Sequence, residues 1–340
     1  MNFDIEERNS RPGRGAPAVV TLGETMALLA VPANGIVREP VPLGIGGAES
    51  NAAIGLARLG IGVTWMSRLG DDALGTYVLR EIRAEGVHVV APRDPDAPTG
   101  LMLKEQRAGV PVRVRYYRAG SAASRLTPAD VDDALVAGAA VLHLTGITPA
   151  LGSGPLSAVR HAIGVARAAG TLVSLDVNHR RTLWSDDEAR STLTALLPGV
   201  DLLFAGPEEA AMLLGRSDPG NSWEFGASAA AELAALGPAT VVLKLGELGS
   251  LSHADGTAHR APTTPADVVD PIGAGDAFVA GYLAELVRGA GPARSLAAGN
   301  LTGGAVVASP GDWEGLPTAA WLAAALDHHT TPTTPTEVIR

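Results

Sequence analysis

The sequence contains no cysteine among its 340 residues, which excludes disulfides, thiolate nucleophiles and cysteine-ligated zinc. Any bound metal must therefore be held by oxygen or histidine ligands. No run of about 18 apolar residues occurs, and residues 1–15 are charged and polar, so neither a membrane span nor a secretion signal is indicated. These absences predict a soluble cytoplasmic protein with no membrane partner.

Positive charge is also scarce, since the formal net charge is −10 at pH 7. An acidic surface argues against nucleic acid as a partner, because binding to a phosphate backbone depends on basic residues. An anionic substrate would therefore need a local cluster of positive charge. One short segment provides a candidate, although a solvated basic face is the simpler interpretation. It contains Lys104, Arg107, Arg113, Arg115 and Arg118.

The hydrophobic content of 46% is enough for a large core, and the order of the apolar segments indicates its architecture. Short β-type runs alternate with Ala- and Leu-rich segments of helical length, which is typical of a parallel sheet covered by helices. Strands are predicted at 18–22, 63–67, 141–144, 171–175, 201–204 and 241–245. Helices are predicted at 48–59, 73–84, 155–169, 187–197, 208–214, 227–236, 275–288 and 293–308.

We expect a single domain over residues 17–329, between flexible polar tails at 1–16 and 330–340. Two segments, 35–43 and 99–118, interrupt the alternation of strands and helices. We expect them to form a small sheet that covers the site as a lid. The second segment is predicted to be a hairpin, with its turn at Ala108-Gly109.

The second arm of this hairpin has two different faces. The two-residue period of a strand places Tyr116 and Arg118 on one face together with two valines, whereas Arg113 and Arg115 lie on the other. The apolar face is expected to point inward. Tyr116 and Arg118 are therefore predicted to contact a ligand, and the other two arginines to face solvent.

The run 268–278 carries the clearest chemical signal, because it is typical of an anion-binding helix start. Gly273, Ala274 and Gly275 would let the backbone approach a ligand, and the free N–H groups of the first turn would face a phosphate. Asp276 is placed to accept the proton of an attacking hydroxyl during phosphoryl transfer. With an ordinary pKa of about 3.9, it would orient the hydroxyl early and take the proton late. The alternative is that Asp276 only stabilises the helix start.

Residues 44–51 are rich in glycine and precede the first long helix. These glycines would let the backbone approach a polyol, and Asn51 offers both a donor and an acceptor. A structural turn is the alternative, because the glycine spacing fits no dinucleotide fingerprint and the chain has no Walker-type loop. The histidines show no metal-ligand spacing and are interpreted as structural or surface residues.

Two further segments, 176–181 and 244–249, directly follow predicted strands, at the edge where α/β sheets bind ligands. In the first, Asn178 is a candidate contact to nucleotide phosphate, and Arg180 to a carboxylate or phosphate. A loop salt bridge is the alternative. In the second, two close glycines suit either ligand phosphates or a plain turn into the next strand.

With these residues in view, almost the whole chain resembles the ribokinase-like (PfkB) family of carbohydrate kinases. The family's two signatures occur in order, at 46–51 and at 270–278. Within the family, the chain is similar to kinases of 2-keto-3-deoxygluconate through residues 115–124, 142–147 and 175–184. The resemblance implies a three-layer α/β/α domain with a central, mostly parallel sheet and a small β-sheet lid.

The resemblance also implies an activity, which is the ATP- and Mg²⁺-dependent phosphorylation of the 6-hydroxyl of 2-keto-3-deoxygluconate by a homo-oligomeric enzyme. The catalytic residues it implies are Gly273, Ala274, Gly275 and Asp276. Those implied to bind the acidic sugar are Gly47, Asn51, Tyr116, Arg118, Arg180, Asp276 and Asp312. Those implied to bind ATP are Asn178, Arg180, Lys244, Gly246, Gly249, Gly273, Gly275 and Asn300.

Two positions depart from the family pattern. Many members carry an Asn-x-x-Glu motif associated with magnesium, whereas this chain begins that motif with Gly206 and retains only Glu209 as the metal residue. Met102 stands where the 2-keto-3-deoxygluconate kinases often carry tyrosine. The alternatives are a fructokinase, a ribokinase, a 5-dehydro-2-deoxygluconokinase, a nucleoside kinase, or a sugar-binding regulator without catalytic activity.

Overall fold

The computed structural model describes residues 17–34, 40–107, 110–217, 220–263 and 266–330. The expected tails lie outside the described residues, except for Thr330, which ends helix α12 (Ala319–Thr330). The turn at Ala108-Gly109 and residues 35–39 also lie outside them. Within these ranges, no helix is both long enough and apolar enough to cross a bilayer.

A nine-stranded sheet forms the centre of the molecule, in the order β15-β14-β13-β12-β11-β10-β1-β4-β6. All neighbours from β13 to β6 are parallel, and β14 and β15 add an antiparallel edge. All the predicted strands are confirmed to within one residue at each end. The strands are β1 (Val19–Leu22), β4 (Val63–Met66), β6 (His88–Val90), β10 (Val141–Thr145), β11 (Leu172–Asp176), β12 (Leu202–Ala205), β13 (Thr240–Lys244), β14 (Ser250–Ala254) and β15 (Thr257–Ala261).

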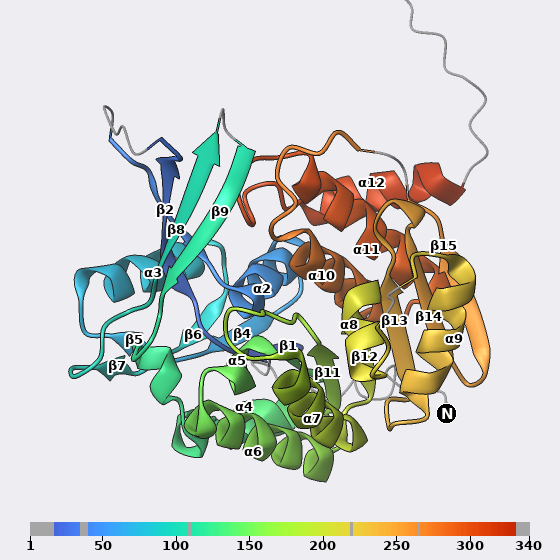
Figure 1. The fold of residues 1–340 in the computed structure, drawn as a ribbon, viewed down its shortest axis with the longest axis horizontal. Coiled ribbons are helices and arrows are strands. Elements are labelled where there is room, and N and C mark those ends of the chain that lie inside the picture. Colours follow the sequence, from blue (N-terminus) through green and yellow to red (C-terminus); the bar gives the residue numbers. More distant parts are fainter. Residues whose placement is uncertain (1–16, 35–39, 108–109, 218–219, 264–265, 331–340) are drawn as a thin grey trace, which may run out of the picture.

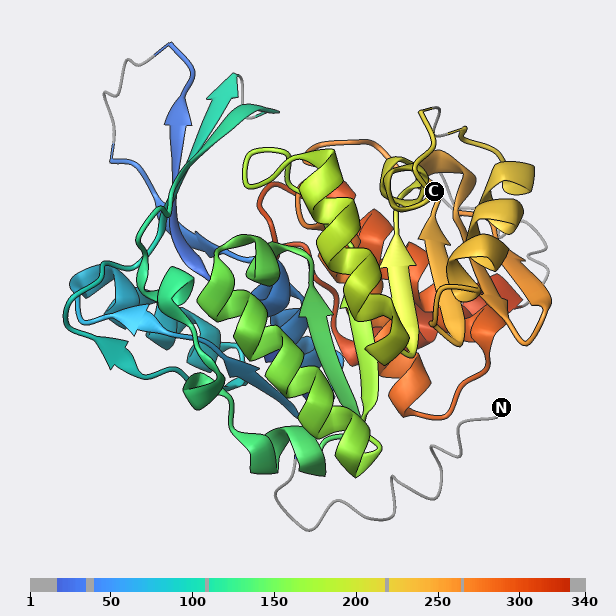
Figure 2. The same cartoon turned by 60° about the horizontal axis from the view of Figure 1, so that its bottom comes forward.

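Helices cover both faces of this sheet, because successive residues of each strand point to opposite sides. Val19 packs into one core cluster and Val20 into the other. The first cluster contains α2 (Ala48–Arg58), α3 (Ala73–Ala84), α10 (Ala274–Val287), α11 (Pro292–Val307) and α12. The second contains α4 (Asp133–Gly138), α6 (Ser153–Ala169), α7 (Asp186–Leu196), α8 (Pro207–Leu213) and α9 (Trp223–Ala234), and short α5 (Ile147–Ala150) packs on α6. Figures 1 and 2 show the resulting three layers.

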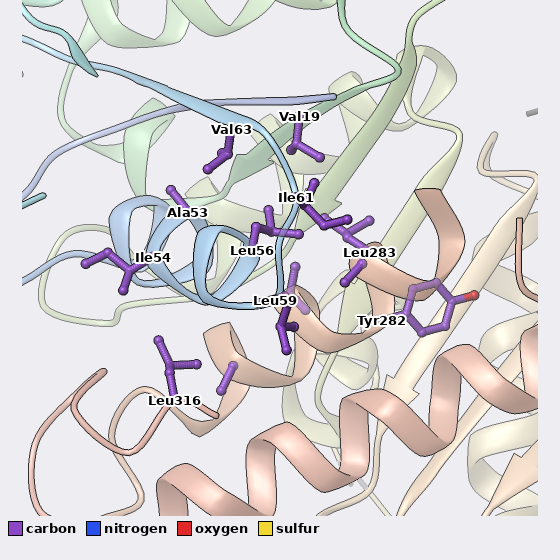
Figure 3. Packing of buried hydrophobic residues seen from close by; sticks show 14 of the residues in the cluster. Val19, Ala53, Ile54, Leu56, Leu59, Ile61, Val63, Tyr282, Leu283 and Leu316 are labelled. Carbon is purple, nitrogen blue, oxygen red and sulfur yellow. The ribbon is translucent and has the colours of Figure 1, made fainter. Parts of the chain in front are cut away.

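Helices α2 and α10 lie side by side in the first layer (Figure 3). Ile54 and Leu56 of α2 and Leu283 of α10 are fully buried between them and the sheet. Burial of each such side chain contributes about 1.5–3 kcal/mol. Helix α10 is apolar almost all round, which is typical of a core helix. This packing fixes the N-terminal ends of both helices, where the two glycine-rich segments lie.

The small sheet stands beside the large one and has the order β3-β2-β8-β9 (Figures 1 and 2). Its strands are β2 (Met26–Pro32), β3 (Leu43–Gly46), β8 (Leu101–Arg107) and β9 (Val110–Tyr117). The antiparallel pairing of β8 with β9 confirms the predicted hairpin. Of the expected lid segment 35–43, residues 35–39 lie outside the described residues, residues 40–42 are not in a strand, and Leu43 begins β3. A further strand of this sheet, β2, follows β1 after three residues and pairs with β8.

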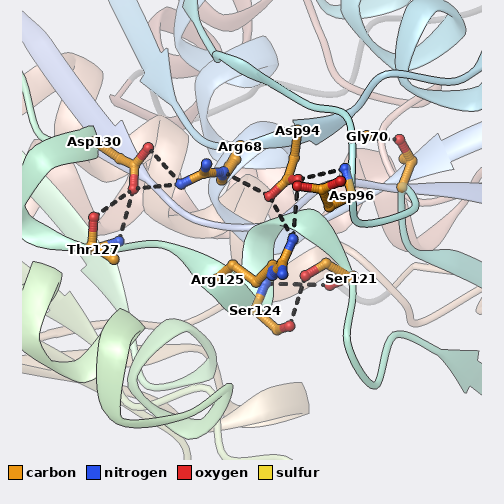
Figure 4. A network of polar contacts seen from close by, with 10 residues as sticks. Arg68, Gly70, Asp94, Asp96, Ser121, Ser124, Arg125, Thr127 and Asp130 are labelled. Atoms are coloured by element: carbon orange, nitrogen blue, oxygen red, sulfur yellow. Dashed lines mark hydrogen bonds and ion pairs between the residues drawn. The ribbon is translucent and has the colours of Figure 1, made fainter.

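A polar network fastens the base of this sheet to the main body (Figure 4). Asp94, which precedes β8, accepts a hydrogen bond from Nη1 of Arg125, which follows β9, at 3.1 Å. Nε of Arg68 lies 3.0 Å from the other Asp94 oxygen. The two ends of the hairpin are therefore held at one place. The short strands beside this network are β5 (Leu69–Gly70) and β7 (Arg93–Asp94).

Candidate active site

A cavity of about 440 Å³ lies where the small sheet meets the carboxyl ends of the central strands. It is close to the point at which the strand order reverses, between β1 and β10, which is the usual ligand position in open α/β sheets. Most of the predicted site residues line it. They are Gly47, Asn51, Tyr116, Arg118, Asn178, Arg180, Glu209, Lys244, Gly273, Gly275, Asp276 and Asp312. Ala274 lies between two of these glycines as the first residue of α10.

Asp276 lies in the first turn of α10 with only 8% of its surface exposed. Nδ2 of Asn51 donates to one carboxylate oxygen at 2.9 Å, and Nδ2 of Asn178 donates to the other at 3.2 Å. Burial is the main influence on the carboxyl group and raises the pKa of Asp276 from 3.8 to about 7. The hydrogen bond from Asn51 and the positive charge of Arg180 oppose this rise. The acidity of Asp276 therefore differs from the ordinary value expected from sequence.

The turn before α10 requires glycine at one position. Gly273 has a φ of +83°, and a Cβ there would collide with the carbonyl oxygen of Asp312. The side chain of Asp270 supports the turn by accepting a hydrogen bond from the N–H of Ile272 at 3.0 Å. Helix geometry leaves the first N–H groups of α10 without intrahelical partners, and they point toward the cavity at the positive end of the helix dipole. The arrangement suits an anion.

Three cations line the cavity, and they differ in how they are paired. Lys244 lies 2.8 Å from both carboxylate oxygens of Asp176. Nε of Arg118 lies 2.6 Å from Oε2 of Glu24. Within the described part of the chain, the guanidinium of Arg180 has no carboxylate partner. Arg180 is therefore the cation most available to an incoming anion, and the salt bridge of this loop is formed by its neighbour Arg181 with Asp186.

The predicted faces are confirmed at the site end of β9, since Arg118, just after the strand, is buried and Tyr116 half-buried, while the side chain of Arg115 is 50% exposed. The prediction is wrong for Val112, which was expected on the inward face and is 54% exposed. The carboxylate of Glu24 holds the Arg118 side chain, so Arg118 already has an anionic partner. Sequence reasoning missed Glu24. Its position two residues after the carboxyl end of β1, like that of Asp176 at the end of β11, was an available signal.

The basic cluster proposed from sequence does not form a single surface. The ammonium group of Lys104 is buried and lies 2.6 Å from Asp270 and 2.6 Å from Asp312. Arg115 points outward and pairs with Glu105. Lys104 and Lys244 are the only two lysines of the chain, and both are bound to carboxylates at this site.

Residues 246–249 form the turn between β13 and β14. Gly246 and Gly249 both have positive φ, and the N–H of Leu245 donates to the carbonyl of Gly249 at 2.8 Å. Neither glycine lines the 440 Å³ cavity. The geometry of a plain turn accounts for both glycines, and a contact to nucleotide remains a prediction.

Asn300 lies on α11 and lines a second cavity of about 630 Å³, formed with β15 and α12. This cavity is mainly apolar, and its wall includes Trp321 and Arg260. Nδ2 of Asn300 donates to the carbonyl oxygen of Ala261 at 2.8 Å. One turn further along α11, Gly303 packs against the start of α10, the helix whose first turn lines the 440 Å³ cavity.

Glu209 lines the first cavity, but both of its carboxylate oxygens already accept backbone hydrogen bonds. These come from the N–H of His179 at 2.8 Å and from that of Gly206 at 2.7 Å. No group of three or more potential ligand side chains occurs within the described ranges. Mg²⁺ commonly uses only one or two carboxylates together with phosphates and waters. Glu209 is therefore compatible with a magnesium ion that it contacts through water.

Comparison with known proteins agrees with this geometry. Residues 17–319 match the pfkB family carbohydrate kinases. The 2-dehydro-3-deoxygluconokinase of Bacillus subtilis is 36% identical over 313 residues, which cover 90% of this chain and 94% of that protein. The 2-dehydro-3-deoxygalactonokinase of Haloferax volcanii is 36% identical over 289 residues, covering 84% and 89%.

A solved structure supports the same assignment. The crystal structure of a PfkB protein from Polaromonas sp. JS666 superposes with a TM-score of 0.80 at 36% identity, covering 91% of this chain and all of that one. The fold predicted from sequence is confirmed, and the chain belongs to the pfkB family of carbohydrate kinases.

Proposed function

We propose that this protein is an ATP-dependent kinase that phosphorylates the 6-hydroxyl of 2-keto-3-deoxygluconate, the sugar acid also named 2-dehydro-3-deoxygluconate. The observation that carries the proposal is the setting of Asp276. Its carboxylate is buried at a helix start, is held by two asparagines, and lies in a cavity with an unpaired arginine. The names of the relatives at 36% identity support an acidic keto-deoxy sugar as the acceptor.

In the proposed reaction, Asp276 acts as general base. The proton of the 6-hydroxyl passes to a carboxylate oxygen of Asp276 while the sugar oxygen bonds to the γ-phosphorus of ATP. The bond between that phosphorus and its bridging oxygen breaks, and ADP leaves with the electron pair. A pKa of about 7 makes Asp276 a stronger base than an ordinary aspartate and leaves much of it ionised near neutral pH. The N–H groups from Gly273 to Asp276 would stabilise charge on the transferring group.

We assign the sugar to the lid side of the cavity. Gly47, Asn51, Tyr116 and Asp312 line that side and offer contacts to its hydroxyls. Arg180 and the N–H groups of Arg118 that Glu24 does not hold are available to the sugar carboxylate. Met102 is buried against the cavity and supplies an apolar contact in place of a tyrosine hydroxyl.

We assign ATP to the opposite side of the cavity. Its phosphates would lie near Asn178, Arg180, Lys244 and the turn at Gly273, and its base in the second cavity beside Asn300. Mg²⁺, held by the phosphates and through water by Glu209, would neutralise part of the phosphate charge when bound. We also expect a cytoplasmic homo-oligomer.

The galactonate epimer is the second candidate acceptor, because a galactonate kinase is as similar to this chain as the gluconate kinase. The two sugars differ at one hydroxyl, which a single polar contact discriminates. Fructokinase and ribokinase activities are weaker candidates because an unpaired Arg180 suits an acidic sugar, and a non-catalytic role is weaker because the site contains a buried, hydrogen-bonded base. 5-Dehydro-2-deoxygluconokinase activity is weaker because relatives with that name are 26–30% identical to this chain.

The test is Mg²⁺-dependent ADP release with ATP and a panel of both keto-deoxy acids, gluconate, fructose and ribose. Asp276→Asn serves as the inactive control. Turnover restricted to the keto-deoxy acids and lost in the control supports the proposal. Turnover on the neutral sugars alone would contradict the acidic-sugar assignment, and no turnover on any of them would favour the non-catalytic role.

A further inference from the structure

Lys104 connects the lid to the base of the anion-binding turn. It lies in β8, between Ala30 of β2 and Val114 of β9, in the middle of the small sheet. Its side chain leaves the sheet and is only 2% exposed. Nζ donates to Oδ2 of Asp270 and to Oδ1 of Asp312, each at 2.6 Å.

The two carboxylates belong to the two segments that shape the turn. Asp270 accepts the N–H of Ile272 at 3.0 Å and that of Gly311 at 3.4 Å, so it ties the turn to the segment after α11. The carbonyl of Asp312 lies directly against Gly273 and fixes the left-handed residue at the start of α10. A shift of either carboxylate therefore moves the N–H groups that face the cavity.

The positions of these two carboxylates depend on a positive charge that the lid supplies. Asp270 and Asp312 are 1% and 4% exposed, and two buried carboxylates this close to each other are unfavourable without a cation between them. Lys104 supplies that cation from β8. Its contact uses Oδ1 of Asp312 and leaves Oδ2 directed toward the lid side, next to Gly46.

Attachment of the lid does not explain Lys104. The base of the hairpin is already fastened by a separate set of contacts among Arg125, Asp94 and Arg68 (Figure 4). A lysine needed only for attachment would not have to bridge two carboxylates beside the turn. Its partners are instead the residues on which the geometry of the anion site rests.

We propose that Lys104 is a positioning residue that couples docking of the lid strand to the geometry of the phosphoryl-transfer site. It does so by holding the carboxylates of Asp270 and Asp312 in place. The inference rests on the proposed kinase function. The docked β8 strand holds the ammonium between the two carboxylates, and the positions of the turn and of Asp312 depend on that contact. Misplacement of reacting groups by about 1 Å costs on the order of 100-fold in rate.

The experiment compares wild-type enzyme with Lys104→Met, which keeps the volume and removes the charge, and Lys104→Ala, which leaves a space for a small amine. Arg115→Met is the matched control, because it removes a cation from the outer face of the same hairpin. Folding is measured by circular dichroism and thermal melting. Steady-state kinetics give kcat and the KM values for sugar and for ATP.

We expect both Lys104 variants to fold and to lose on the order of 100-fold in kcat/KM for the sugar, mainly through kcat. n-Propylammonium, which replaces the atoms removed in Lys104→Ala, is expected to restore turnover in that variant. Tetramethylammonium, which has no N–H donor, is expected not to restore it. Arg115→Met is expected to behave as wild type.

Normal kcat/KM in folded Lys104→Met would overturn the proposal. So would a folded Lys104→Ala variant whose activity n-propylammonium fails to raise, or variants that remain unfolded with and without the amine, since these indicate a purely structural role. If the wild-type enzyme prefers another sugar of the panel, the comparison uses that sugar. An error in the assigned substrate is thereby separated from an error about Lys104.

Discussion

The side chain of Asn51 donates a hydrogen bond of 2.9 Å to Asp276, although 225 residues separate the two along the chain. The contact joins the first turn of α2 to the first turn of α10, and the packing of these helices in Figure 3 keeps both turns in place. It places the candidate base against the segment assigned to the sugar. Four predictions concern this contact and its neighbours.

The pH dependence of turnover should report the ionisation of Asp276. Because a general base must be deprotonated, kcat/KM is expected to rise with pH and to level off above about 7. The hydrogen bond from Asn51 lowers the pKa of Asp276, so Asn51→Ala should move the rising limb to higher pH. A pH–rate profile of both enzymes checks this. An unmoved limb, or one moved to lower pH, would exclude Asp276 as its source.

The stability of Asp276→Asn should differ from wild type in a pH-dependent way. The pKa of Asp276 is raised from 3.8 to about 7 in the folded state, so the folded protein binds this proton more tightly than the unfolded chain. The contribution of this carboxyl group to the stability of the folded wild-type protein is therefore fully present below about pH 4 and is lost as the pH rises through about 7. Asparagine does not ionise, so the variant is not destabilised in this way as the pH rises. The melting temperature of the variant minus that of wild type should therefore increase from pH 4 to pH 8. A difference that does not change with pH would contradict the raised pKa.

Gly273→Ala should damage the anion site through the backbone. The φ of +83° and the adjacent carbonyl of Asp312 leave no room for a methyl group, so we expect about 1–3 kcal/mol of lost stability and little turnover. Gly164→Ala is the matched control, because this exposed position within α6 has open space around it and should gain about 0.5–1 kcal/mol. Denaturant unfolding and kinetics measure both. An active, fully stable Gly273→Ala enzyme would refute the assigned turn.

Arg180→Met should weaken the site in two ways. It removes the unpaired cation of the cavity, so kcat/KM should fall on the order of 100-fold. The positive charge of Arg180 lowers the pKa of Asp276, so the pH–rate limb should also move upward. Arg181→Met is the neighbouring control, since that side chain is 76% exposed and pairs with Asp186. Equal effects of the two variants would show that Arg180 has no special role.

Local patterns were sufficient for much of the fold. Apolar runs of strand length predicted the central strands, and the two-residue period predicted correctly that Arg118 is buried and Arg115 exposed. The glycine-rich turn predicted the start of α10 because φ > 0 and close backbone approach are needed there. These features depend on residues that are neighbours in the chain.

The parts that sequence reasoning missed depend on contacts between distant segments. Lys104 belonged to a run of basic residues, and nothing local showed that its partners are 166 and 208 residues away. The Glu24–Arg118 pair is likewise formed only when β1 and the lid meet. The high pKa of Asp276 follows from burial by the assembled layers, which no local motif contains.

Because the chain has only two lysines, chemical modification of lysine can report on the site independently of catalysis. Lys104 is 2% exposed and Lys244 19%, so an acylating reagent specific for amines meets a single partly accessible side chain, and that side chain lies in the cavity. A molecule occupying the phosphate side would shield Nζ of Lys244. The rate at which one tryptic peptide gains mass would therefore measure ligand occupancy directly, even for compounds that are never turned over.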